Sequence, residues 1–178
     1  MMRIVCSSLL LLCSLALVPF IAAQEKKPLP VVPAGFQFNG TWDCEGTFRN
    51  SKVHKAVFTG TMVLNEKWLE LTEQDLQPAT GYSAKYLIGY NPQQKRLVEF
   101  DANTFGAAIY ASEEGWQNHV LIMTSPISQE VGAPYAANRF LYSITDQDTF
   151  TVDWQISKTA VLNWIQSDHL ACRRRADK

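Results

Sequence analysis

The residues that could carry acid–base or metal chemistry are spread widely along this chain. The three histidines are His54, His119 and His169. None of them stands at His-x-His spacing or beside a Cys-x-x-Cys pair, which are spacings typical of zinc sites. The pattern therefore favours hydrogen-bonded histidines in the core or on the surface, and we expect no metal ligands.

Motifs of nucleophilic and phosphate chemistry are missing from the sequence. It contains no Gly-x-Ser-x-Gly elbow, no phosphate-binding glycine loop and no His-Glu-x-x-His. An enzyme without such a motif would have to transfer protons through polar groups inside its folded core. We therefore assign no catalytic residues and keep a small hydrolase or isomerase as the second hypothesis. Two inward ionisable groups within hydrogen-bond reach of each other would favour it.

Aromatic residues give the clearest indication of a binding site. Several of them share the alternating phase of the apolar residues around them, the pattern of a strand with one buried face. They either fill a closed core or line an apolar pocket in which tyrosine hydroxyls orient a ligand. The residues predicted to contact such a ligand are Trp42, Phe58, Met62, Tyr82, Tyr86, Phe140, Tyr142 and Trp154.

These side chains are positioned by about ten short segments with alternating patterns and turn signals between them, typical of a β-sandwich or β-barrel. In the second segment we expect Phe58, Met62 and Leu64 to face inward. The loop 125–136 is long and contains proline and glycine, so we expect it to cover the mouth of a barrel. The expected strands are residues 36–48, 53–64, 67–76, 82–90, 97–102, 104–111, 116–124, 138–145, 150–156 and 164–173.

Cys44 and Cys172 stand on the first and last expected strands. In an oxidising compartment they would pair, and the alternative is two free buried thiols. A bridge would remove about 4–5 kcal/mol of chain entropy from the unfolded state in the loop-entropy model. It would also place the last strand beside the first, which closes a sheet into a barrel. We therefore predict an all-β fold, a closed or nearly closed antiparallel up-and-down barrel of about 8–10 strands.

The bridge fixes which way the last strand faces. Alternation from the bridge puts Gln166 and Asp168 on the same face as Trp42, and His169 on the opposite face. An inward carboxylate is costly unless it has a partner. We therefore expect Asp168 to pair with a basic group or a hydroxyl, or to lie near the rim.

The two ends of the chain are not part of the barrel. Arg3 followed by the apolar residues 4–23 predicts a signal peptide that is cleaved before Gln24, and a retained membrane anchor is the alternative. The predicted location is therefore secreted or periplasmic. Residues 24–35 are expected to form a proline-rich linker, residues 36–173 the barrel and residues 174–178 a solvated basic tail.

The charge of the chain excludes some partners. Removing residues 1–23 takes one of the 16 basic residues away and leaves 15 against 17 acidic ones, a net charge of −2. A near-neutral domain of this kind is not expected to bind nucleic acid or an anionic membrane surface. The sequence carries no information on the oligomeric state.

A resemblance to a known superfamily rests on Gly40, Thr41 and Trp42 in the first expected strand. Together with the up-and-down strands and the basic residues after the last one, they resemble the calycin superfamily, which includes the lipocalins. Calycin barrels often hold a small apolar ligand. The resemblance implies that Trp42 plugs the closed end and that Arg173 or a neighbour packs across it.

A more detailed likeness covers residues 36–173 and is to a family of secreted bacterial proteins. Those are calycin-like barrels of uncharacterised function. The likeness is carried by residues 39–42, Gly46, residues 58–61, residues 89–92 and Asp101.

A partial likeness to nitrobindin-like haem barrels gives the third hypothesis. Those proteins also open with a Gly-x-Trp strand and use a late histidine as the iron ligand. His169 is the only late histidine here, and its predicted outward phase opposes that role. Our first hypothesis is therefore non-enzymatic binding of a small apolar or amphipathic molecule, with no cofactor.

Overall fold

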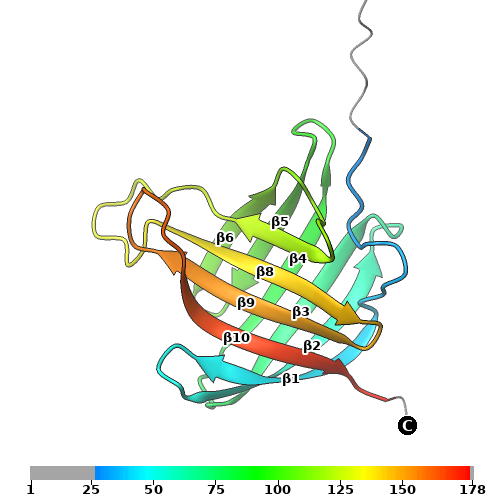
Figure 1. Cartoon of the computed structure of the whole chain (residues 1–178), viewed down its shortest axis with the longest axis horizontal. Helices are drawn as coiled ribbons and strands as arrows, with labels where there is room; N and C mark the ends of the chain where they lie inside the picture. Colours follow the sequence, from blue (N-terminus) through cyan, green and yellow to red (C-terminus); the bar gives the residue numbers. More distant parts are fainter. Residues whose placement is uncertain (1–26, 177–178) are drawn as a thin grey trace, which may run out of the picture.

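The computed structural model describes residues 27–176, and this part of the chain is all-β. Its ten strands form a closed antiparallel up-and-down barrel, as the sequence predicts (Figure 1). Each strand pairs with the next, and the last returns to pair with the first. The strands are β1 (Gly40–Phe48), β2 (Val53–Val63), β3 (Trp68–Gln77), β4 (Ser83–Asn91), β5 (Arg96–Asn103), β6 (Gly106–Ser112), β7 (Val120–Thr124), β8 (Ala137–Asp146), β9 (Thr149–Ser157) and β10 (Ile165–Arg174).

The predicted signal peptide, residues 1–23, lies outside the described residues, as do residues 24–26 of the expected linker and 177–178 of the expected tail. Within residues 27–176, no helix is long and apolar enough to cross a membrane.

The barrel closes where β1 pairs with β10. Cys44 lies directly opposite Cys172 in the register, with a Cα–Cα distance of 4.0 Å, and the two form the predicted disulfide. Such a bond is consistent with an oxidising compartment. Close approach of the two strands also requires Gly46, because a Cβ atom there would lie 1.7 Å from the carbonyl oxygen of His169.

One end of the barrel is filled by aromatic rings. Trp42 is 0% exposed and meets Phe150 edge-on, with ring centroids 4.8 Å apart. Phe38 packs edge-on against the same Phe150 ring, and its carbonyl oxygen accepts a 2.8 Å hydrogen bond from Trp42 Nε1. Burial of rings of this size, with the indole N–H satisfied, makes this closed end the main apolar core.

The described part of the expected linker packs against the closed end. Leu29, Val31 and Val32 contact the buried core, and Trp116 Nε1 donates a 2.9 Å hydrogen bond to the carbonyl oxygen of Val31. This segment therefore adds apolar surface to the barrel.

Arg174 covers the outer side of this core. Its guanidinium lies 4.1 Å from the ring centroid of Trp42 and donates hydrogen bonds to the carbonyl oxygens of Gln37 and Asn39. The resemblance implied this role for Arg173 or a neighbour, and the neighbour performs it. Arg174 thus belongs to β10 rather than to a free tail, and Arg175 pairs with Asp43.

Three details of the expected strands were wrong. Leu64 does not face inward: it is 64% exposed and has φ 52°, because the turn between β2 and β3 already begins there. Gln166 is exposed, because a register shift between Gln166 and Asp168 breaks the alternation that we extended from the disulfide. His119 does not lie in the seventh strand: it occupies an exposed turn with φ 66°, and β7 begins one residue later.

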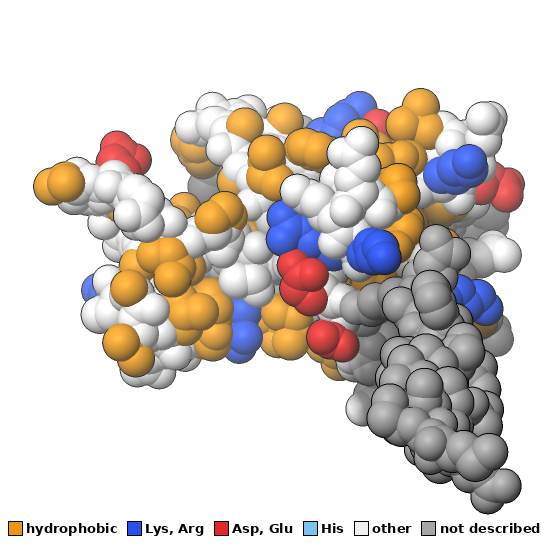
Figure 2. Space-filling model, turned by 90° about the horizontal axis from the view of Figure 1, so that it is seen from above, with side chains coloured by type: hydrophobic (Ala, Val, Ile, Leu, Met, Phe, Trp, Pro, Cys, Tyr) orange, Lys and Arg blue, Asp and Glu red, His pale blue; other side chains and the backbone are white. Residues whose placement is uncertain are grey.

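The pairing between β6 and β7 is the shortest in the barrel. These strands share one register pair, Ala111 with Thr124, whereas β5 and β6 share seven. The first half of β6, from Gly106, is therefore not paired with β7. Beyond β7 the loop 125–136 projects from the barrel, at the left of Figure 1 and of Figure 2.

Candidate functional site

A cavity of about 500 Å³ occupies the end of the barrel opposite the Trp42 core. Its lining combines aromatic rings with ionisable side chains. The loop 125–136 does not close over it: Val131 is 100% exposed, and Tyr135 is its single lining residue among those described. The lining residues are Phe48, His54, Glu73, Asp75, Thr80, Tyr82, Tyr86, Asp101, Asn103, Phe105, Gly106, Ala107, Ala108, Tyr110, Tyr135, Phe140, Trp154 and Asp168.

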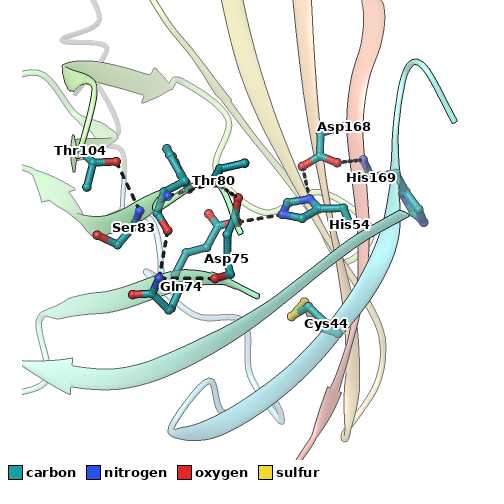
Figure 3. Close-up of polar contacts among 12 residues, drawn as sticks. Cys44, His54, Gln74, Asp75, Thr80, Ser83, Thr104, Asp168 and His169 are labelled. Atoms are coloured by element: carbon teal, nitrogen blue, oxygen red, sulfur yellow. Dashed lines mark hydrogen bonds and ion pairs between the residues drawn. A yellow bond between two sulfur atoms is a disulfide. The ribbon is translucent and has the colours of Figure 1, made fainter. Parts of the chain in front are cut away.

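His54 is the central polar group of this cavity. It is the second residue of β2, in phase with the buried Ala56 and Phe58, and is only 2% exposed. Its Nδ1 lies 2.9 Å from Asp168 Oδ2 and its Nε2 lies 2.8 Å from Asp75 Oδ1, so the ring is held between two carboxylates (Figure 3). This arrangement joins β2, β3 and β10 across the barrel.

The two carboxylates determine the charge of His54. Burial acts to lower the pKa of the imidazole, but the hydrogen bonds from Asp168 and Asp75 outweigh it and raise the pKa to about 9. His54 is therefore an imidazolium at neutral pH and donates to both carboxylates. Thr80 Oγ1 donates a further 2.9 Å bond to Asp75.

The prediction for Asp168 is confirmed. It points inward and pairs with a basic group, while His169 points to the opposite face (Figure 3). On that outer face His169 Nδ1 lies 2.7 Å from Asp153 Oδ1, and the His169 side chain is 44% exposed. His169 therefore cannot reach a ligand in the cavity, which removes the residue that the haem hypothesis named.

A second polar chain starts at Glu73, two residues before Asp75 on β3. Tyr86 donates a 2.6 Å hydrogen bond to Glu73 Oε2, and the hydroxyl of Tyr82 lies 3.1 Å from that of Tyr86. Because the proton of Tyr86 is directed at Glu73, Tyr82 is the donor in the second bond. Burial, together with the nearby charge of Asp75, raises the pKa of Glu73 to about 7, against the effect of the Tyr86 bond.

Two more carboxyl groups come from β5. Asp101 lines the cavity and accepts hydrogen bonds of 3.0 and 3.1 Å from the side-chain amide of Asn103. Glu99 lies in the barrel interior, 0% exposed, with Oε2 accepting a 3.2 Å bond from Tyr142 and Oε1 without a partner among the described residues. Burial, assisted by the charge of Asp101, raises the pKa of Glu99 to about 8, so this group is mostly protonated at neutral pH.

Four of the eight predicted ligand contacts line the cavity: Tyr82, Tyr86, Phe140 and Trp154. The other four lie elsewhere. Trp42 and Phe58 are packed in the apolar core, Met62 packs at its edge, and Tyr142 is buried against Glu99. For these eight residues the alternating pattern identified packed or cavity-lining positions, but it does not tell which end of the barrel a strand residue occupies.

Sequence reasoning found Asp168 but missed the carboxyl groups of β3 and β5. Glu73 and Asp75 continue the alternation of the buried Leu69 and Leu71 on β3. On β5, Asp101 is likewise in phase with the buried Leu97. Acidic residues that continue an inward apolar phase were therefore the available signal.

His54, Glu73 and Asp75 each offer one ligand atom, and these atoms lie within 4.8 Å of one another. A metal ion needs a neutral imidazole with a free lone pair. Both ring nitrogens of His54 already donate to carboxylates, and its raised pKa keeps the ring protonated at neutral pH. An ion at this cluster would have to displace the proton and break at least one of these two hydrogen bonds.

No protein-family model matches the chain. No curated protein matches it either. Function must therefore be inferred from the cavity itself.

Proposed function

We propose that this protein binds a small amphipathic molecule in the open half of its barrel. The observation that carries the proposal is the cavity of about 500 Å³ between the polar residues and the aromatic rings. This volume is within the range of small-molecule sites, which are typically concave, largely apolar and equipped with a few converging polar groups. Phe140 and Trp154 supply apolar surface, and the hydroxyl of Tyr82 supplies a polar contact.

The architecture also supports a binding role. The Trp42 core at the other end is closed and tightly packed, so the open end does not have to be filled for the barrel to fold. We propose that the ligand enters at the junction of β6 and β7, because a single register pair joins these strands and Ala108 of β6 lines the cavity.

Fluorescence titration with prodan, a neutral dye that brightens in apolar surroundings, tests this proposal. Ala108 lines the cavity, and its substitution Ala108→Trp fills the space with an indole ring. Ile109→Trp is the matched control, because Ile109 is 54% exposed on the outside of the same strand. We expect the first variant to bind prodan at least about tenfold more weakly and the second to bind like wild type. Equal binding by all three proteins would refute binding in the cavity.

Acid–base catalysis is the second candidate function. Its specific support is the contact of inward ionisable groups, His54 with Asp75, and the pKa of Glu73 near 7, where a general acid or base works best. Since no serine or cysteine is among the described lining residues, a proton-transfer isomerase fits better than a hydrolase with a covalent intermediate.

Enzyme-dependent deuterium exchange at the carbon next to a ketone, followed by NMR on a panel of cyclic enones, tests the second candidate. If the protein is such an isomerase, Glu73→Gln should slow the exchange by about 100-fold or more. Exchange no faster with the protein than with buffer would rule this activity out for that substrate class.

A further inference from the structure

We propose that the cavity selects a small organic cation, an amine carried on an apolar body. This inference rests on the proposed binding function and names the chemical class of its ligand. It is drawn from the imbalance of charge in the lining and from two carboxyl groups that lack a positive partner.

The lining carries more acidic than basic groups. Four carboxyl groups face the cavity, from Glu73, Asp75, Asp101 and Asp168, whereas His54 is the one basic residue among the described lining residues. Fully ionised carboxylates with a protonated His54 would give the lining a net charge of −3. A concave surface of one charge, enclosed by low-dielectric walls, concentrates ligands of the opposite charge.

His54 neutralises only part of this charge. It is hydrogen-bonded to Asp75 and Asp168. Glu73 lies within 4.8 Å of the imidazole but forms no ion pair with it, and Asp101 forms no ion pair with the described residues. The partner of Glu73 is the hydroxyl of Tyr86, and the partner of Asp101 is the neutral side-chain amide of Asn103. An ammonium group that entered the cavity would supply the missing positive partner.

Glu73 also leaves a hydrogen-bonding position open. It is 7% exposed and lines the cavity, Oε2 is bonded to Tyr86, and Oε1 accepts no hydrogen bond from the described residues. An ammonium group has three N–H donors, so it could satisfy Glu73 Oε1 and still donate elsewhere.

The apolar part of the lining suits the same ligand. Phe105, Phe140 and Trp154 present aromatic rings to the cavity. Aromatic faces attract cations and also bury apolar groups, so they can hold both parts of an amine with a hydrocarbon or aromatic body. A hydrated metal ion would gain little from this surface.

Isothermal titration calorimetry with matched probes tests the inference. The probes are phenethylamine, tryptamine and decylamine, each compared with the alcohol in which a hydroxyl replaces the amino group. The titrations are run at about pH 8, above the pKa of Glu73 of about 7. We expect at least one amine to bind about tenfold or more tightly than its alcohol, the gain typical of hydrogen bonds to a charged group.

Three variants locate the effect. Glu73→Gln and Asp101→Asn remove a charge and keep the shape and the acceptor of the side chain, so each should weaken amine binding about fivefold to tenfold and weaken alcohol binding by a clearly smaller factor. Glu70→Gln is the matched control, since Glu70 lies on the opposite face of the same strand and pairs with Lys85 3.1 Å away. It should bind both probes like wild type.

The outcomes separate the two proposals. Amines and alcohols that bind equally would overturn the selection of a cation and leave the binding function standing. If no amine and no alcohol binds, both proposals are wrong. Zn²⁺, titrated separately, would also overturn the inference if it bound tightly and lost its affinity in Glu73→Gln, because the carboxylates would then belong to a metal site.

Discussion

The two ends of the barrel are built from the same strands but from opposite kinds of side chain. At the closed end the inward residues are Trp42, Phe38 and Phe150, covered by Arg174. At the open end the same inward phase carries His54 and the carboxylates around it. A single closed barrel therefore separates a packed apolar core from an ionisable cavity.

The direction of each strand determines whether its apolar or its ionisable inward residues come first in the sequence. Odd-numbered strands run toward the open end, so on β3 the inward residues Leu69 and Leu71 precede Glu73 and Asp75. Even-numbered strands run the other way. On β10 Asp168 therefore precedes the buried Leu170. The change from apolar to ionisable residues reverses between neighbouring strands, as it must in an antiparallel barrel.

The packed core at the closed end explains how the fold tolerates several buried carboxyl groups at the open end. Several carboxyl groups in a low-dielectric interior are destabilising, and they persist because burial elsewhere compensates for them. The closed end supplies that burial, together with the disulfide between Cys44 and Cys172. We therefore expect mutations at the two ends to have different effects.

The largest expected difference in stability is between two tryptophans. Trp42→Ala should lower the free energy of unfolding by about 4 kcal/mol, because Trp42 is fully buried among other rings. Trp154→Ala should cost about 1 kcal/mol, because Trp154 is half-buried at the cavity. Urea denaturation measures both. Similar losses for the two variants would show that the ends are packed alike.

A smaller difference in the free energy of unfolding is expected when two histidines paired with aspartates are replaced, one inside the barrel and one on its surface. His54→Gln leaves Asp75 and Asp168 without their cation, so at neutral pH it should cost about 3 kcal/mol. His169→Gln breaks the exposed pair with Asp153 and should cost no more than about 0.5 kcal/mol. Denaturation of both variants compares the pairs.

The pH gives a second test of the same variants. Above about pH 9 wild-type His54 loses the proton that it shares with the two carboxylates, so the loss in His54→Gln should shrink. An equal loss for both histidine variants, independent of pH, would contradict the special role of the interior pair.

A further expected effect is the pH dependence of wild-type stability. The folded protein raises the pKa of His54 from 6.5 to about 9, of Glu73 from 4.5 to about 7 and of Glu99 from 4.5 to about 8. All three shifts mean that the folded state binds more protons than the unfolded state. Stability should therefore fall as the pH rises between about 5 and 9, by up to about 1.4 kcal/mol per pH unit for each proton.

The individual groups act in different parts of this range. The contribution of His54 is complete below its unfolded pKa of 6.5 and is lost as the pH rises toward about 9. Glu73 and Glu99 destabilise the folded state above their unfolded pKa of 4.5, because the unfolded chain then releases protons that the folded protein still holds. Thermal unfolding across this range measures the sum, and Glu99→Gln should flatten the slope. A melting temperature that rises with pH would show that these groups are not buried as described.

Much of the fold could be predicted from the sequence, because alternation and turn residues are local signals. The ten strands followed from them. The Cys44–Cys172 closure followed instead from the two cysteines, and the inward orientation of Asp168 followed from alternation counted from that bridge. The bulge at Gln166 could not, because it depends on how β9 and β10 fit together. The site was predicted only in part, since the partners of His54 are 21 and 114 positions away in the chain.

Native mass spectrometry of wild type, Ala108→Trp and Ile109→Trp, each mixed with phenethylamine, tryptamine and decylamine, tests binding in the cavity most directly. We expect a one-to-one adduct with wild type and with Ile109→Trp, lost on denaturation and absent from Ala108→Trp. Adducts of equal intensity on all three proteins would place binding outside the cavity. No adduct on any of them would contradict the proposed function.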